Sequence, residues 1–150
     1  MLRSFREEDT EAVVAIWLEA SLQAHGFIDG KYWRARAQDM RTLYLPLSDV
    51  IVSVNETTGE VEGFMAFVDD FLAALFVGPE HQRKGIGTRL LDVAKKIHPD
   101  MELSVYAQNT RARTFYERHG FRMVSRRVED ATGQLELVMR RRPMRICESM

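Results

Sequence analysis

The first part of the chain combines a strand-like segment with two helix-like apolar patterns. Residues 2–6 alternate weakly between apolar and polar side chains, which predicts a first strand. Asp9 or Thr10 can cap the helix that follows, and its apolar face is Ala12, Val13, Ile16, Trp17 and Ala20. A second helix is predicted from Lys31 to Tyr44, closed by Pro46, with one face formed by Tyr32, Trp33, Ala37, Met40 and Leu43.

The rest of the chain has patterns that predict several strands, the turns between them and two further helices. Strands are expected at residues 50–54, 61–68, 71–77, 101–106, 121–128 and 135–139. Helices are expected from Gly85 to Ile97 and from Asn109 to His119. Because strands both precede and follow helices, the order predicts an α/β (α+β) fold with a mixed, partly parallel central sheet of about seven strands, flanked by four helices.

Composition limits the class of protein. The 150 residues are 45% hydrophobic and 29% charged, typical of one globular domain. We expect this domain at residues 1–142 and a disordered C-terminal tail at 143–150. The formal net charge of −1 favours neither nucleic acid nor a membrane as partner, and no metal is expected. The N-terminus lacks the apolar core of a signal peptide, and the single cysteine, Cys147, fits a reducing compartment, so a cytoplasmic location is expected.

The segment from Val77 to Gly87 is the strongest functional signal in the chain. It leads from an apolar strand through a short polar loop into a helix. Gly85 and Gly87 allow a ligand to approach the backbone, and the first N–H groups of a helix have no partner within it. Arg83 and Lys84 add positive charge. The loop therefore predicts a phosphate or pyrophosphate site, although it matches neither the P-loop nor the dinucleotide fingerprint.

A second motif lies between Asn109 and Phe121. Ala112, Phe115, Tyr116 and His119 recur at helical spacing and predict one buried stripe. Asn109 stands at the N-cap position and Gly120 just past the C-terminus. Helix formation alone does not account for Tyr116, whose inward-facing hydroxyl needs a partner.

Together the two motifs resemble those of the GNAT acetyltransferase superfamily. Gln82-x-x-Gly85-x-Gly87 resembles its coenzyme A pyrophosphate loop, and Asn-x-x-Ala-x-x-Phe-Tyr-x-x-x-Gly-Phe resembles its second motif. The resemblance covers roughly residues 2–142 and is closest to small, single-domain bacterial-type members. It implies transfer of an acetyl group from acetyl-CoA to a primary amine: a protein lysine or N-terminus, a peptide, or a small amine.

The resemblance also implies roles for individual residues. Tyr116 is expected to protonate the leaving thiolate, since a phenol with a pKa near ~10 is protonated at neutral pH. The alternative is that Tyr116 only fills the core. The residues expected to hold acetyl-CoA are Leu75, Phe76, Val77, Gln82, Arg83, Lys84, Gly85, Ile86, Gly87 and Asn109.

The general base stays open. Some family members carry a glutamate five residues before the motif asparagine, where this chain has Ser104. Glu102 lies two residues earlier on the same strand face. His25 has a suitable ordinary pKa, although a solvated loop histidine is the simpler interpretation. A water chain to bulk solvent is the third option.

The acceptor site is expected between residues 21–33 and the hairpin at 127–134. Trp17, His25, Phe27 and Trp33 either rim an amine pocket through cation–π contacts or belong to the core. The acidic residues Asp69, Asp70, Glu129 and Asp130 either attract a cationic acceptor or are solvated. Lysine or N-terminal acetylation is favoured over antibiotic modification, and the protein is expected to be a monomer or homodimer.

Two other functions remain open from the sequence. A non-catalytic sensor of acyl-CoA is favoured by the missing strand glutamate. A nucleotide-binding protein using the same loop is disfavoured, because no motif specific for a base or a ribose accompanies it.

Overall fold

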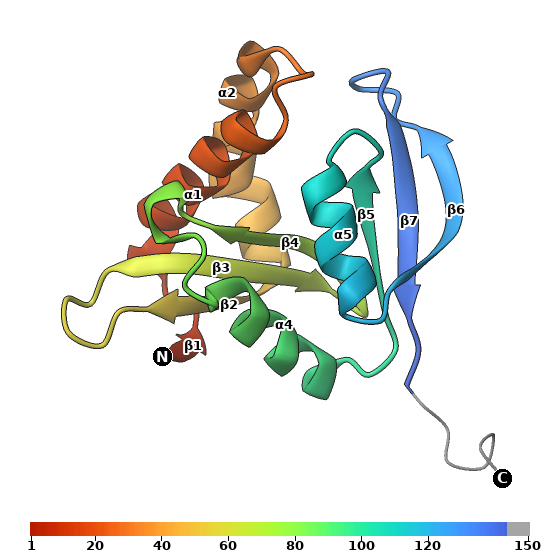
Figure 1. The fold of residues 1–150 in the computed structure, drawn as a ribbon. Helices are drawn as coiled ribbons and strands as arrows, with labels where there is room; N and C mark the ends of the chain where they lie inside the picture. The colour runs from red at the N-terminus through yellow and green to blue at the C-terminus, as the bar shows by residue number, and fades with distance from the viewer. Residues whose placement is uncertain (144–150) are drawn as a thin grey trace, which may run out of the picture.

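The computed structural model describes residues 1–143, which form a seven-stranded sheet with helices packed against it (Figure 1). The strand order is β1-β2-β3-β4-β5-β7-β6, and only β4 and β5 pair in parallel. The strands are β1 (Leu2–Ser4), β2 (Asp49–Val54), β3 (Val61–Val68), β4 (Phe71–Val77), β5 (Met101–Tyr106), β6 (Arg122–Val128) and β7 (Leu135–Arg141). The main helices are α1 (Thr10–Ala24), α2 (Gly30–Asp39), α4 (Ile86–Ile97) and α5 (Thr110–Arg118). The predicted mixed sheet and its four flanking helices are confirmed.

Two apolar clusters fix the helices to the sheet. One joins α1 and α2 to β2 and β3, and the other joins α4 and α5 to the strands from β3 onward. The central strand β3 supplies both, because successive side chains point to opposite faces. Phe64 and Ala66 belong to the first cluster, whereas Met65 and Phe67 belong to the second.

The second predicted helix departs from its expected form near its end. After α2 the chain makes a π-helical turn at Met40–Tyr44 and a last turn, α3, at Leu45–Leu47. The wider turn advances the buried face by one residue. Leu43, expected on that face, is therefore exposed, and Leu45 is buried instead. Pro46 does not close the helix, because it stands in the first residues of α3, where a missing N–H costs little.

The prediction for one residue on the apolar face of the first helix is also wrong. Ala12 is exposed, and Val14 takes a place in the core. Val13, Ile16, Trp17 and Ala20 are buried as expected. The apolar stripe of α1 is wide, and the sequence pattern alone does not decide whether Ala12 or Val14 lies at its buried edge.

Strands β4 and β5 pair only where they begin. Their register comprises Phe71 with Glu102 and Leu72 with Leu103. Beyond Leu72 the two strands point apart, as Figure 1 shows, while β4 continues to pair with β3 as far as Val77. Within the described residues, the outer part of β4 therefore has no strand partner on its β5 side. The N–H and C=O groups on such an edge remain available for pairing.

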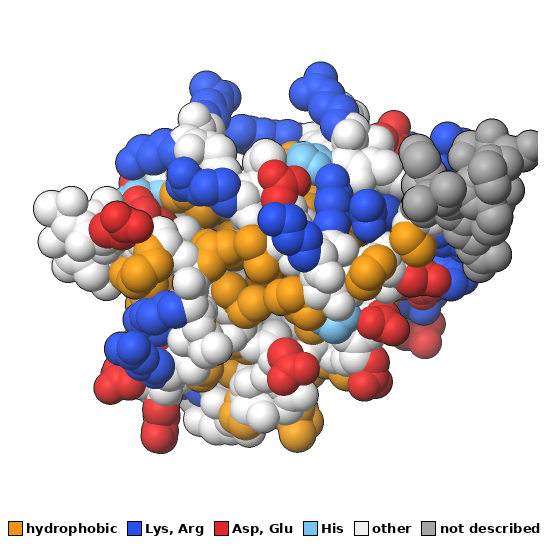
Figure 2. All heavy atoms as spheres, turned by 90° about the horizontal axis from the view of Figure 1, so that it is seen from below, with side chains coloured by type: hydrophobic (Ala, Val, Ile, Leu, Met, Phe, Trp, Pro, Cys, Tyr) orange, Lys and Arg blue, Asp and Glu red, His pale blue; other side chains and the backbone are white. Residues whose placement is uncertain are grey.

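The surface carries both signs of charge. In Figure 2, Lys and Arg side chains gather in the upper part of the view above a centre of hydrophobic side chains, and Asp and Glu are scattered around its rim. No helix within residues 1–143 is long and apolar enough to cross a membrane.

We propose that residues 1–142 form a single domain. One sheet runs from Leu2 to Arg141 and holds both apolar clusters. Residues 144–150 of the predicted tail, including Cys147, lie outside the described residues, so the predicted disorder stays a prediction.

A glycine substitution tests how closely β3 approaches β4. A Cβ atom on Gly63 would lie 3.0 Å from the carbonyl oxygen of Phe76 and 3.3 Å from Cγ2 of Ile86. Since backbone would have to move, we expect Gly63→Ala to lower the free energy of unfolding by about 1–3 kcal/mol. Urea unfolding measures this loss, with Gly26→Ala as the control because nothing lies within 4 Å of its Cβ position. Equal stability of the two variants would contradict the described packing.

Candidate functional site

A cleft of about 820 Å³ lies where the end of β4, the starts of α4 and α5, and the end of α1 meet. Its walls include all but one of the residues that the sequence predicts as ligand-binding or catalytic. Those present are Leu75, Phe76, Val77, Gln82, Arg83, Gly85, Ile86, Gly87, Asn109 and Tyr116. Lys84 is exposed and does not line the cleft.

The loop that enters α4 presents unpaired main-chain donors. Gly85 is the N-cap residue, with a φ of 79°, and no side chain caps this helix end. Arg83 also has a positive φ, 67°, which is costly for a residue with a Cβ. Alternating right- and left-handed residues turn successive N–H groups toward one side, and the helix dipole adds positive potential there. This local backbone therefore suits an anionic ligand.

The side chain of Gln82 has a structural task. Its Nε2 donates to the carbonyl oxygen of Val77 at 3.1 Å and to Oε1 of Gln23 at 3.0 Å. These bonds tie the loop to the end of β4 and to α1. Both donors of Nε2 are therefore used within the protein.

Gly87 lies where three elements converge. A Cβ atom there would stand 3.6 Å from Cζ of Phe115 and 3.8 Å from Cγ2 of Val77. Those distances are ordinary van der Waals contacts, so the fold itself tolerates a Cβ. A larger side chain would extend into the cleft, which Gly87 lines.

Asn109 joins α5 to the loop after α1. Its Oδ1 accepts from the backbone N–H of Ala112 at 3.2 Å, which confirms the predicted N-cap. Its Nδ2 lies 3.2 Å from Nε2 of His25. Because an amide nitrogen only donates, Nε2 accepts this bond. Asn109 thus holds the helix start and the α1–α2 loop in one position.

Tyr116 lies in the wall of the cleft with its ring in the second apolar cluster. The ring makes edge contacts with Phe115 and Phe121. Burial raises the pKa of the Tyr116 hydroxyl well above its ordinary value, so the group is protonated at neutral pH. Among residues 1–143, no side chain or carbonyl group is found bonded to that hydroxyl. It can therefore give its proton to a group in the cleft.

The prediction of a solvated His25 is wrong. The residue is only 7% exposed, and its ring stacks on Trp33 with centroids 5.1 Å apart. The rings of Phe27 and Tyr106 meet its edges. This apolar enclosure lowers the pKa of His25 to about 4. The imidazole is therefore neutral and weakly basic at pH 7, which disfavours it as the general base.

The two other positions considered for the base lie elsewhere. Glu102 lines a separate depression of about 590 Å³ with Asp69, Asp70 and Arg140, and is not among the residues that line the cleft of Tyr116. Ser104 accepts a hydrogen bond from Nη2 of Arg127 at 3.3 Å. Neither position is among the residues that line the cleft, so neither places a base there.

The residues considered for the acceptor pocket mostly serve the fold. Trp17 and Trp33 belong to the first apolar cluster, with Phe27 packed against it. Glu129 is not simply solvated, because its Oε1 accepts from the hydroxyls of Tyr106 and Thr132, each at 2.7 Å. Asp70 pairs with His98 at 2.8 Å.

Several cleft residues are not predicted by the motifs. Gln23 comes from the end of α1, where the sequence shows only a helix face. Arg111 and Arg118 on α5 add cationic side chains that the sequence analysis left as helix surface. Phe115, predicted as core, also lines the cleft.

Taken together, the cleft fits a long ligand with an anionic middle. The unpaired edge of β4 offers N–H and C=O groups to an extended amide-containing chain. The loop at 82–87 offers main-chain donors to phosphates, and Arg83, Arg111 and Arg118 surround it with positive charge. Coenzyme A combines these two chemical parts.

Comparison with known proteins agrees with this description. Residues 47–123 match the family model for an acetyltransferase (GNAT) domain. Peptidyl-lysine N-acetyltransferase YiaC of Escherichia coli K12 is 35% identical over 133 residues, covering 88% of this chain and 90% of that protein. Peptidyl-lysine N-acetyltransferase YjaB of the same strain is 32% identical over 133 residues, covering 89% of each chain. The solution structure of apo YjaB from Escherichia coli superposes with a TM-score of 0.84 at 29% identity, covering 96% of this chain and 98% of that one.

The chain belongs to the GNAT acetyltransferase family. It is an N-acetyltransferase, as its two motifs predict, and the acyl donor of the family is acetyl-CoA. A coenzyme A complex has been solved for a more distant protein of the same fold, the PaiA N-acetyltransferase of Thermoplasma acidophilum, with a TM-score of 0.76 at 20% identity over 95% of this chain and 98% of that one.

Burial of His25 predicts acid sensitivity. Its folded-state pKa, about 4, lies below the ordinary 6.5, so the unfolded chain binds more protons between these values and stability is lost as the pH falls through this window. We expect His25 to account for a loss of about 2 kcal/mol between pH 7 and pH 5. Urea unfolding at both pH values, with His25→Phe as the comparison, measures it. An unchanged pH dependence in this variant would contradict the assignment.

Proposed function

We propose that this enzyme acetylates lysine side chains of proteins or peptides, with acetyl-CoA bound in the cleft beside β4. The observation that carries the proposal is the early separation of β4 from β5, next to a helix start rich in free donors. Relatives that cover nearly nine-tenths of the chain are named peptidyl-lysine N-acetyltransferases, which supports lysine as the acceptor.

The main chain of the cleft binds and orients the donor. In the proposal, the edge of β4 at Leu75 and Val77 pairs with the pantetheine arm, while Phe76 between them keeps its bonds to β3. The amides from Gln82 to Gly87 hold the pyrophosphate. An N–H on the same strand faces the thioester oxygen and stabilises the negative charge that develops there. Bound acetyl-CoA supplies an activated acetyl group with a thiolate as the leaving group.

Tyr116 supplies the proton for the leaving group. Its hydroxyl stays protonated because burial raises its pKa, and it faces the same cleft as the β4 edge. As the bond from the acetyl carbon to sulfur breaks, the hydroxyl gives its proton to the sulfur. Asn109 caps the start of the same helix, α5, and keeps that helix in place.

The incoming lysine loses its proton to water in this proposal. His25 is a poor acceptor at neutral pH, and Glu102 lines a different depression. A chain of water molecules along the open cleft requires neither residue.

We also propose a cytoplasmic location, which fits the use of acetyl-CoA and of protein lysines. A monomer or a homodimer is compatible with this site.

An assay with a lysine peptide tests the proposed acceptor. With acetyl-CoA and an N-terminally blocked peptide that holds one lysine, we expect release of free coenzyme A and a peptide mass increased by one acetyl group. The matched peptide with arginine in place of lysine should give neither. If small amines or free N-termini react while lysine peptides do not, lysine is the wrong acceptor.

A Tyr116→Phe variant separates catalysis from binding. We expect kcat to fall roughly 10²–10⁴-fold, the usual contribution of a general acid, while the Kd for acetyl-CoA stays unchanged. Tyr44→Phe is the control, because Tyr44 is 50% exposed and lies outside the cleft. Full activity in Tyr116→Phe would restrict this residue to core packing. A wild-type protein that binds acetyl-CoA but transfers nothing would be the sensor that the sequence left open.

A further inference from the structure

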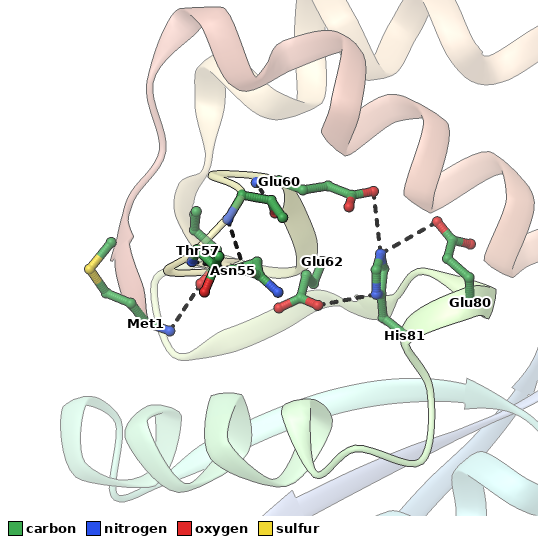
Figure 3. A network of polar contacts seen from close by, with 9 residues as sticks. Met1, Asn55, Thr57, Glu60, Glu62, Glu80 and His81 are labelled. Atoms are coloured by element: carbon green, nitrogen blue, oxygen red, sulfur yellow. Dashed lines mark hydrogen bonds and ion pairs between the residues drawn. The ribbon is translucent and has the colours of Figure 1, made fainter.

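A histidine surrounded by glutamates lies just before the proposed pyrophosphate loop. Figure 3 shows the ring of His81 between the carboxylates of Glu60, Glu62 and Glu80. Glu60 and Glu62 flank the start of β3, and Glu80 and His81 follow the end of β4. The cluster therefore joins the β2–β3 hairpin to the loop that enters α4. His81 also lines the cleft, but the transfer reaction proposed above uses none of these four residues.

The two ring nitrogens of His81 face opposite sides of the cluster. Nδ1 lies 3.1 Å from Oε2 of Glu62, and Nε2 lies 3.4 Å from Glu60 and 3.6 Å from Glu80. A neutral imidazole carries only one N–H. With that proton on Nε2, the ring donates to Glu60 at 3.4 Å. With the proton on Nδ1, the Nε2 lone pair faces two carboxylates, and a cation bound between them would relieve that repulsion.

The His81 ring is also buried, which makes an unsatisfied ring nitrogen costly. His81 is only 9% exposed, and its Nδ1 is buried without a hydrogen bond of normal geometry although Glu62 is near. A buried nitrogen without a hydrogen bond costs free energy, and a small rotation of the ring would complete the bond from Nδ1 to Glu62. A metal ion bound to Nε2 would fix the ring in one orientation.

The spacing on the Nε2 side suits a tetrahedral metal ion better than direct ion pairs. Charged hydrogen bonds between nitrogen and oxygen are usually about 2.7–2.9 Å long, shorter than both distances here. Zinc bonds of about 2.0–2.1 Å at tetrahedral angles place neighbouring ligand atoms about 3.4 Å apart. The ligand atoms of Glu60, Glu80 and His81 all lie within 4.8 Å of one another. The side chains of Glu60 and Glu80 are more than half exposed, so they can rotate to close the remaining gap.

The hairpin that carries Glu60 is held in place by its own turn. Oδ1 of Asn55 accepts from the N–H groups of Thr57 and Thr58, and the Asn55 N–H donates to the carbonyl of Glu60 at 2.8 Å. On the other side, the N–H of Gly78 donates to the carbonyl of Glu62 at 2.9 Å. Both segments are thus positioned before any ion binds.

We propose that His81 Nε2, Glu60 and Glu80 form a binding site for a divalent cation of the zinc class. Glu62 holds the proton on Nδ1 and so keeps Nε2 free as a ligand, the usual task of a carboxylate behind a metal-bound histidine. An imidazole with two carboxylates favours zinc over magnesium and calcium, which select sites made of oxygen ligands. Three protein ligands leave a fourth position for water.

Such an ion would act on the neighbouring loop. His81 directly precedes Gln82, and a metal bridge to the hairpin would restrict the backbone that presents the amides up to Gly87. This consequence rests on the proposed function, whereas the site itself does not. We expect saturating zinc to tighten acetyl-CoA binding about 5-fold or more, and acetyl-CoA to tighten zinc binding by the same factor.

Calorimetric titration of the full chain, free of any histidine tag and of acetyl-CoA, tests the site. We expect one zinc ion per protein, and no heat of binding from magnesium or calcium. The double variant Glu60→Gln/Glu80→Gln should lose at least about 100-fold in zinc affinity, and Glu62→Gln roughly 10–100-fold. The matched control is Glu56→Gln, an exposed glutamate of the same hairpin, which should bind zinc as the unmodified chain does.

Two results would overturn the proposal. One is the absence of zinc binding at pH 7.5, which would leave the cluster as contacts within the protein alone. The other is zinc binding that survives the double variant. Because Glu60 and Glu80 are exposed, the double variant should fold, and urea unfolding checks this. Failure of lysine acetylation would leave the titration unaffected, so the two proposals fail independently.

Discussion

The proposed site depends on the separation of β4 from β5 after Leu72. Each strand keeps a full antiparallel partner on its other side, β3 for β4 and β7 for β5, so the sheet as a whole remains intact. The cost is confined to a few unpaired backbone groups at the mouth of a cleft. Those groups leave an otherwise ordinary mixed sheet with an open edge, which we propose binds the donor, and α4 and α5 belong to the apolar cluster on one face of that sheet.

The start of α4 adds a second set of unpaired groups to the same cleft. Here the chain accepts a left-handed conformation at Arg83 and leaves the helix without a side-chain cap. Gln82 steadies this loop from the side of β4 and α1, and the cluster around His81 lies on the side of the β2–β3 hairpin. Tyr116 and Asn109 come from α5, so every part of the site is carried by an element whose apolar face is buried.

Local patterns predicted much of this. Every strand and the cap of α5 by Asn109 follow from spacing and turn chemistry within short segments, whereas the convergence of both motifs on one cleft followed from the family resemblance. The failures involve contacts distant in sequence. Nothing near His25 shows that Trp33, Tyr106 and Asn109 will enclose it. The π-helical turn at 40–44 is decided by tertiary packing, and the glutamates around His81 are too scattered to form a recognisable metal motif.

Amide hydrogen exchange, measured with and without coenzyme A, tests most directly whether the open edge of β4 and the loop before α4 bind the donor. The account predicts that coenzyme A slows exchange at residues 75–77 and 82–87, with little change on the distant strands β1 and β6. Protection that is absent from both segments, in a protein that demonstrably binds coenzyme A, would contradict it.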